Sequence, residues 1–222
     1  MDIEMHPSTG LVESIEQRHA VRSFLHDTIP EVILERIISL ALRAPSAHNL
    51  QPWRFIVLRS KENKQKLYEC AFNQKQIIAA PVVLICCGDR RVNQPEYIEK
   101  VIKLGQDQKV ITEAAAQIIR QKIPALFENK PCFNDLEAWT NRNTMIAVAY
   151  LTIIAQSFGL NSCPMEGFIT EKVKTAFNIP EEVDICCLLC LGYTSEPYKK
   201  FGGRFAIDEV CYSESFGEKF KI

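Results

Sequence analysis

The sequence lacks several features that mark other classes of protein. Its charge is almost balanced, with 26 basic and 27 acidic side chains and a net charge of -1, so no broad basic surface for nucleic acid or anionic lipid is expected. No run of 18 uncharged apolar residues occurs, and the first twenty residues do not form an apolar core followed by a small-residue cleavage site. We therefore expect a cytoplasmic protein with neither a nucleic-acid nor a membrane partner.

The nine cysteines do not indicate a metal site. Cys186, Cys187 and Cys190 are close in sequence, but the four histidines lie far from them in the chain. Cys86 and Cys87 likewise fall in an apolar run, and adjacent cysteines in a strand point to opposite faces. We interpret the cysteines as buried small apolar residues and predict no metal. Glycine-rich phosphate loops of the Rossmann or P-loop type are also absent.

The stretch APSAHNLQPWRF, which begins at Ala44, is the most distinctive part of the chain. Pro45 and Pro52 each hold φ at about -65° and lack a backbone donor, so the stretch should be stiff. Short polar side chains that can read a flat ligand with alternating donors and acceptors are Ser46, Asn49 and Gln51. The alternative is an ordinary proline-marked loop between a helix and a strand.

Apolar periodicity predicts the main elements of the fold. Helices are expected over residues 11–20, 31–41, 60–71 and 135–158, and strands over 53–58, 81–87 and 184–192. Ser8 or Thr9 could cap the first helix, Ser60 the third, and Gly159 could end the last. A chain of 222 residues with 47% apolar residues can bury about 70% of its unfolded surface, which favours one domain over residues 1–222.

Arg18 and Arg22 end the first predicted helix. If the helical turn continues, residues four apart share a face, and the two guanidinium groups would suit a phosphate or a carbonyl-rich ring. The alternative is a solvated helix face. The segment from about 93 to 134 is polar and irregularly periodic, with its clearest helical pattern at 114–119.

Four segments, in this order and spacing, resemble the FMN-dependent nitroreductase family. They are Arg18 to Arg22, Ala44 to Phe55, Pro164 to Gly167 and Arg204. The resemblance implies an α+β fold, an α/β sandwich in which helices flank a mainly antiparallel central sheet. It also implies an entwined homodimer with two FMN sites at the interface. Residues 93–134 would be the variable excursion that covers the substrate pocket, and the C-terminal tail, 193–222, would reach across the dimer.

The resemblance also implies the residues that hold FMN. The candidates are Arg18, His19, Arg22, Pro45, Ser46, Asn49, Gln51, Asn73, Gln76, Pro164, Met165, Glu166, Gly167 and Arg204. Arg18 and Arg204 would bind the phosphate end, Arg22 the pyrimidine end, and the Gly167 N–H would point at flavin N5. One subunit would supply Arg18, Arg22, Asn73, Glu166, Gly167 and Arg204. The other subunit would supply Pro45, Ser46, Asn49 and Gln51.

Two of these segments have an alternative interpretation, and two positions depart from the family pattern. Asn73 could be a helix cap, and residues 163–168 could be a helix-to-helix turn capped by Thr170. Gln76 stands where the family has a basic residue, which should leave a reduced anionic flavin less stabilised and its potential lower. Gly202 replaces a second basic residue near the phosphate, although Lys199 and Lys200 lie just upstream.

The implied activity is an NAD(P)H-dependent oxidoreductase that works by a ping-pong hydride transfer. NADH or NADPH would reduce FMN and leave the site. A small oxidised acceptor such as a nitroaromatic or quinone would then take the place of the nicotinamide. No side chain need act as a general acid, so no catalytic residue is assigned. The alternatives are a flavin or enone reductase that uses the same site, a flavin-binding dimer without turnover, and a structural dimer with a decayed site.

Overall fold

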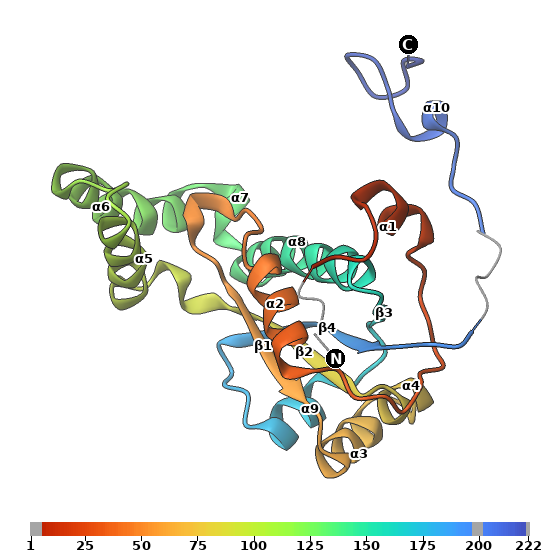
Figure 1. Ribbon diagram of the computed structural model, residues 1–222. Helices are drawn as coiled ribbons and strands as arrows, with labels where there is room; N and C mark the ends of the chain where they lie inside the picture. The colour runs from red at the N-terminus through yellow and green to blue at the C-terminus, as the bar shows by residue number, and fades with distance from the viewer. Residues whose placement is uncertain (1–5, 197–201, 221–222) are drawn as a thin grey trace.

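A four-stranded antiparallel sheet forms the centre of the molecule in the computed structural model, which describes residues 6–196 and 202–220 (Figure 1). The strand order is β1-β2-β4-β3. The strands are β1 Trp53–Leu58, β2 Val82–Asp89, β3 Asn161–Met165 and β4 Val183–Gly192. The sheet confirms the predicted α+β class and the three strands expected from the sequence, and it adds β3 at one edge.

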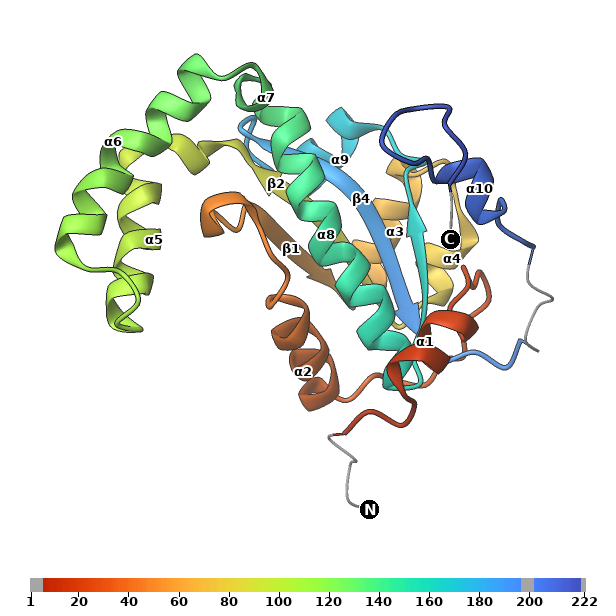
Figure 2. The same ribbon diagram turned by 90° about the horizontal axis from the view of Figure 1, so that it is seen from above.

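Helices cover both faces of this sheet (Figures 1 and 2). One face packs against α3 Lys61–Cys70, α4 Lys75–Ala79 and α9 Thr170–Phe177. The other packs against α2 Glu31–Ala41 and α8 Leu136–Ser157. Every residue of β2 and β4 is buried, because a central strand covered on both faces has no solvent side. Their near-continuous apolar sequence follows from this position.

Capping residues fix two helices where the sequence predicted. The Ser60 side chain accepts a hydrogen bond from the backbone N–H of Asn63 and starts α3. The Asp135 carboxylate does the same for Ala138 and starts α8. Gly159 has φ +75°, a left-handed conformation suited to glycine, just after α8 ends. The central long helix is therefore confirmed to within a residue at each end.

The first helix is shorter than predicted and is not capped as predicted. It spans Leu11–Gln17 (α1), its N-cap is Gly10, and no side chain makes a cap hydrogen bond there. Arg18 already has extended angles, φ -63° and ψ 120°. The expectation that Arg18 and Arg22 share a helix face was wrong, since the chain leaves the helix to run beside β3, where Val21 N–H donates to Ser162 O. The apolar side chains of α1 are exposed: Leu11, Val12 and Ile15.

The excursion is more regular than its sequence suggested. It contains η2 Arg90–Asn93, α5 Pro95–Asp107, α6 Glu113–Asn129 and α7 Pro131–Asn134. Thr112 caps α6 by accepting from Ala115 N–H, and Pro95 begins α5. These helices share an apolar cluster with the start of α8 and the loop before β1: Leu50, Ile98, Ile102, Ile123, Phe127 and Trp139. Each of these helices packs one apolar face on this cluster and leaves the other face exposed, which accounts for the weak periodicity of the sequence here.

The C-terminal segment stands away from the sheet in Figure 1. Residues 202–220 contain one short helix, α10 Ile207–Val210, and large exposed apolar side chains such as Phe205 and Phe216, the latter 92% exposed. The prediction that the tail reaches across a dimer stays a prediction, as does a single domain over 1–222. Lys199 and Lys200 lie outside the described residues. Within the described residues, no helix is both long and apolar enough to cross a bilayer.

Candidate functional site

The loop between α2 and β1 has a tightly specified shape. It contains η1 Ala47–Asn49, and His48, Asn49 and Gln51 have positive φ values of 55°, 55° and 44°. The Ser46 hydroxyl accepts a hydrogen bond from Gln51 N–H at 2.9 Å, and the side-chain oxygen of Asn143 accepts one from Ala47 N–H at 3.0 Å. One of these bonds lies within the loop and the other joins it to α8, so the loop is held more firmly than its prolines alone would hold it.

This loop borders a cavity of about 590 Å³. Pro45, Asn49 and Gln51 line one side of the cavity, and Leu104 and Gln108 line the other. Leu104 belongs to α5, so the excursion forms a wall of the cavity next to the loop. The structure thus brings three of the four predicted loop residues to one cavity, while Ser46 holds the backbone behind them.

A second group of predicted residues gathers at β3. Arg18 and Arg22 flank the segment that pairs with Ser162, and their positive charges act on the neighbouring Cys163. Burial raises the pKa of the Cys163 thiol, while the two guanidinium groups oppose that rise. Pro164 is exposed and Met165 is buried against Cys190. His19 lies beside a different cavity, of about 510 Å³, which Gln156 and Thr194 also line.

Two side-chain hydrogen bonds connect this group to α4. The Gln76 side chain is buried and donates to the side-chain oxygen of Gln74 at 3.1 Å, and Gln74 Nε2 donates to Gly167 O at 2.7 Å. A Cβ at position 167 would lie 2.9 Å from Gln74 Nε2, so a larger residue there would displace the Gln74 amide from its hydrogen bond with Gly167 O. Gln74 was not predicted; its position two residues before Gln76 is the sequence signal that could have found it.

The remaining predictions at this edge have mixed outcomes. Asn73 has φ 54° and is not a helix cap, since Gln74 is the N-cap of α4. The helix-to-helix turn is wrong as well, because residues 161–165 form β3 and Ile169, not Thr170, is the N-cap of α9. Glu166 is exposed, and its carbonyl accepts from Phe168 N–H, so backbone atoms hold this turn.

The two groups lie at opposite edges of the sheet. The loop leads into β1 and the other group surrounds β3, with β2 and β4 between them. Three strand spacings separate the edge strands by about 14 Å. Arg204 is exposed on the C-terminal segment, where its Nη1 donates to Gly203 O. A single chain therefore presents the predicted residues as separate sets.

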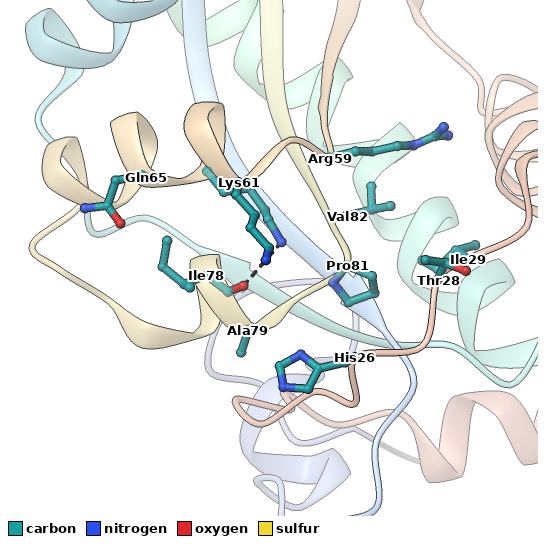
Figure 3. A pocket seen from close by; sticks show the side chains of 11 residues that line it. His26, Thr28, Ile29, Arg59, Lys61, Gln65, Ile78, Ala79, Pro81 and Val82 are labelled. Carbon is teal, nitrogen blue, oxygen red and sulfur yellow. Dashed lines mark hydrogen bonds between the residues drawn. The ribbon is translucent and has the colours of Figure 1, made fainter.

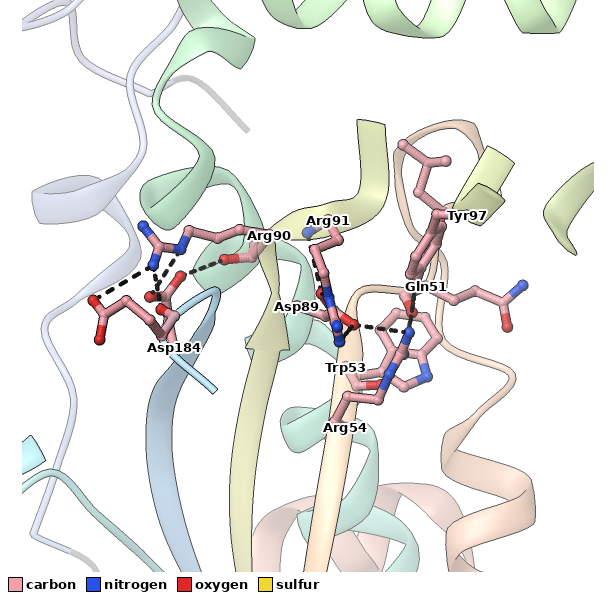
Figure 4. A network of polar contacts seen from close by, with 11 residues as sticks. Gln51, Trp53, Arg54, Asp89, Arg90, Arg91, Tyr97 and Asp184 are labelled. Carbon is pink, nitrogen blue, oxygen red and sulfur yellow. Dashed lines mark hydrogen bonds and ion pairs between the residues drawn. The ribbon is translucent and has the colours of Figure 1, made fainter. Parts of the chain in front are cut away.

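A polar network behind the loop was not found from the sequence (Figure 4). Arg54 Nη2 lies 3.4 Å from Asp89 Oδ2 and donates to the Tyr97 hydroxyl at 2.9 Å. Asp89 is 2% exposed, and Arg91 binds both of its oxygens, at 2.8 and 2.9 Å. Burial opposes the charge on Asp89, but the Arg91 hydrogen bonds and the nearby Arg54 outweigh it, so the carboxyl pKa is lowered. A lone acid at the end of an apolar strand was the available signal.

The cysteines behave as buried apolar residues. All nine are free, and seven of them are buried. Cys187 and Cys190 do have the C-x-x-C spacing, which the sequence interpretation overlooked, but residues three apart in β4 point to opposite faces and pack in different clusters. Within the described residues, no group of three or more His, Cys, Asp or Glu side chains could hold a metal ion.

A further cavity of about 740 Å³ lies near α3 (Figure 3). Its lining includes His26, Arg59 and Lys61 over an apolar floor with Ile78 and Pro81. Arg59 is paired with Glu31. None of the predicted site residues that the structure describes lines this cavity.

Comparison with known proteins identifies the family. The model of the Nitroreductase family matches residues 15–193. A Thermus thermophilus protein named NADH dehydrogenase is 36% identical over 180 residues, covering 81% of this chain and 84% of that protein. YodC of Bacillus subtilis, whose name includes NAD(P)H nitroreductase, is 30% identical and covers 85% of this chain and 92% of its own length.

A solved structure shows the same fold. It is a protein from Exiguobacterium sibiricum in complex with FMN, with a TM-score of 0.83 and 22% sequence identity, covering 94% of this chain and 99% of that one. Fold and comparisons together define the chain as an α+β oxidoreductase. It belongs to the nitroreductase family. The family that the four motifs predicted, the FMN-dependent nitroreductases, is confirmed.

Proposed function

We propose that the protein is an FMN-dependent oxidoreductase that takes hydride from NADH or NADPH and reduces small oxidised acceptors such as nitroaromatics or quinones. The observation that carries the proposal is the pair of residue groups at opposite sheet edges, one cationic and one an amide-rich loop. Family membership and the names of the two relatives support the nicotinamide donor.

The residues at the β3 edge fit a flavin phosphate and ring. Arg18 and Arg22 supply cationic donors for a phosphate or a carbonyl-rich ring edge. The buried Ser162 hydroxyl beside them has no hydrogen-bond partner among the described residues, so it can accept one from a ligand or a water. We propose that these two arginines hold FMN, with Asn73 and Gly167 at the ring and Arg204 at the phosphate.

A homodimer would complete this site. Because the loop carrying Pro45, Ser46, Asn49 and Gln51 lies at the opposite sheet edge, it fits a flavin held by a second copy better than one held by its own subunit. The exposed apolar side chains of α1 and of the C-terminal segment supply surface for such a contact. FMN supplies reversible hydride acceptance, and this chain's residues bind and orient it.

Neutral side chains next to Gly167 have a consequence for flavin chemistry. Gln76 and Gln74 form an amide chain in the region where the family has a basic residue. An amide stabilises a developing negative charge less than an ammonium group does. We propose that the flavin potential is lower than that of a Gln76→Lys variant, and a measured rise in potential on that substitution is the expected result.

The deciding experiment is a titration of the purified protein with FMN, followed by anaerobic NADH or NADPH. Bound flavin should give absorption bands near roughly 370 and 450 nm that bleach when the donor is added. Light scattering on the same sample should give twice the chain mass. A protein that stays colourless after incubation with FMN would overturn the proposal.

Acceptor choice is resolved with the same reduced protein. Reoxidation by a nitroaromatic or a quinone supports the proposed class, whereas reoxidation only by free flavin or by an enone supports the alternative reductases. Bleaching without steady turnover on any of these acceptors supports a flavin-binding module. We also propose the cytoplasmic location expected from the sequence, since nine free cysteines suit a reducing compartment; cell fractionation tests it.

A further inference from the structure

The loop before β1 holds an unfavourable backbone shape. His48, Asn49 and Gln51 are left-handed, with φ values of 55°, 55° and 44°. This conformation costs a residue other than glycine about 1 kcal/mol, although asparagine tolerates it better. Such a backbone persists only where surrounding groups hold it.

Two side chains from outside the loop hold it from behind (Figure 4). The Tyr97 hydroxyl lies 2.8 Å from Leu50 O and 2.9 Å from Gln51 O, and it donates its proton to this carbonyl pair. Arg54 Nη1 donates to Gln51 O at 3.1 Å and to Trp53 O at 2.7 Å. The Gln51 carbonyl, on the last of the three left-handed residues, therefore accepts hydrogen bonds from both Tyr97 and Arg54.

Arg54 and Tyr97 are themselves fixed. Arg54 Nη2 donates to the Tyr97 hydroxyl, and its guanidinium carbon lies 5.4 Å from the centre of that ring. Behind them, the buried Asp89 carboxylate faces Arg54 and is bound by Arg91, while Asp89 N–H donates to Pro52 O at 2.8 Å. The end of β2 thus orients the two donors.

The same tyrosine connects the loop to the cavity wall. Tyr97 and Leu104 both belong to α5 and are seven residues apart, which puts them on one face of the helix. Leu104 lines the cavity of about 590 Å³ opposite Asn49 and Gln51. A change at the Tyr97 hydroxyl therefore alters both the loop and the spacing between the loop and α5.

We propose that Tyr97, oriented by Arg54 and Asp89, is a positioning residue that sets the shape of the Asn49–Gln51 segment and the width of the adjoining cavity. This inference rests on the proposed FMN-dependent function. Tyr97 touches neither flavin nor acceptor in this role; it acts through the backbone of residues that do. The excursion then tunes the acceptor pocket through a hydrogen bond to the loop.

The test is Tyr97→Phe, which removes the hydroxyl and keeps the ring. We expect the FMN dissociation constant and the acceptor KM each to rise about tenfold, as the loss of one such hydrogen bond allows, with kcat changed less than about twofold. Tyr68→Phe, on α3, is the matched control and should change neither constant. A purely structural role would lower the melting temperature and leave both constants at the wild-type values.

A double-variant cycle shows whether the residues act as one unit. Arg54→Lys keeps the charge facing Asp89 but removes the forked donor, so its effect on KM should overlap with that of Tyr97→Phe, and the double variant should be less than additive. Wild-type constants in Tyr97→Phe, or strict additivity, would overturn the inference. If Tyr97→Phe does not fold, Arg54→Lys alone must show the rise in KM. Failure of the wild-type protein to bind FMN overturns the proposed function and this inference with it.

Discussion

The loop at residues 44–51 and the C-terminal segment at 202–220 both carry residues implied to hold FMN, but the chain supports them very differently. The loop is hydrogen-bonded to three other elements, through Asn143 of α8, Tyr97 of α5 and Arg54 of β1. The C-terminal segment makes contacts within itself, such as Ala206 N–H to Glu209 and the ring contact of Tyr212 with Phe216.

In the proposed dimer, this difference separates the part of the FMN site that one chain builds alone from the part that depends on the second copy. A loop whose carbonyls and amides have partners from α5, α8 and β1 keeps its shape without a ligand. Contacts within the C-terminal segment shape it locally, and a position over the proposed site would come from the surface that the segment packs against. In the proposed dimer, that surface belongs to the second copy, so the loop is preformed and the tail is placed by assembly.

The largest effect is expected from removing the carboxylate behind the loop. Asp89→Ala leaves Arg54 and Arg91 without their buried partner, and because both arginines remain about half exposed, we expect the free energy of unfolding to fall by about 2 kcal/mol. Urea unfolding measures it. Glu99→Ala, which breaks an exposed pair with Arg120, is the control and should cost much less. Equal losses in both variants would show that the loop has no special support.

Arg204→Ala should act on the cofactor and not on the fold. Arg204 is exposed, so the free energy of unfolding of the FMN-free protein should stay within about 0.5 kcal/mol of wild type. Loss of a charge-assisted bond to phosphate should weaken FMN binding by about tenfold or more. Flavin fluorescence during titration gives the constant. Unchanged FMN affinity would remove Arg204 from the site and leave the tail a structural role.

Ser46→Ala tests the loop at its first internal bond. The hydroxyl accepts from Gln51 N–H, and its loss leaves that amide without its partner, so stability should fall by about 1 kcal/mol. FMN affinity should fall too, because Gln51 adopts its left-handed angles next to the cavity. Thermal unfolding with and without FMN separates the two effects. A variant that is stable and binds FMN normally would show that the contacts from Asn143, Tyr97 and Arg54 shape the loop without the Ser46 hydroxyl.

The smallest predicted effect is on acid stability. The folded-state pKa of Asp89 is lowered from its ordinary value of 3.8, so its contribution is complete above that value and is lost as pH falls through the folded-state pKa. Asp184 changes stability in the opposite direction as pH falls, since burial raises the folded-state pKa of its carboxyl above the ordinary value. Comparison of Asp89→Asn with wild type isolates the first group. Acid unfolding followed by circular dichroism should show the variant losing less stability below pH 4.

The sequence was informative where a pattern is local. Apolar runs located β1, β2 and β4, and capping residues located α3 and α8 to within about two residues. It failed where partners came from elsewhere in the chain. Arg18 looked helical because residues 11–15 are periodic, yet pairing of the following residues with β3 draws the chain out of the helix. Within the excursion, the helical pattern at 114–119 located part of α6, but α5 and α7 were missed because their apolar faces are short and cover a separate small cluster.

The site followed the same division. Motif residues at 45–51 and 164–167 were selected from their types and spacing, and their role in holding FMN stays a prediction. Gln74, Arg54, Asp89 and Tyr97 were not selected, since each matters through a contact with a residue distant in the chain or on another element. Gln74 and Asp89 had at most a weak signal from their positions in the sequence, and Arg54 and Tyr97 had none.

The sequence by itself determined the family, the central antiparallel strands and the stiff amide-bearing loop, because strand burial, helix capping and proline restraint depend on residues close together in the chain. The tertiary structure decided which predicted ligands share an edge of the sheet, which carbonyls of the loop receive donors, and where α5 closes the cavity. Those features arise from packing between elements far apart in sequence. The free energy of these contacts depends on burial and on hydrogen-bond geometry, and the order of residues in the sequence does not show either one.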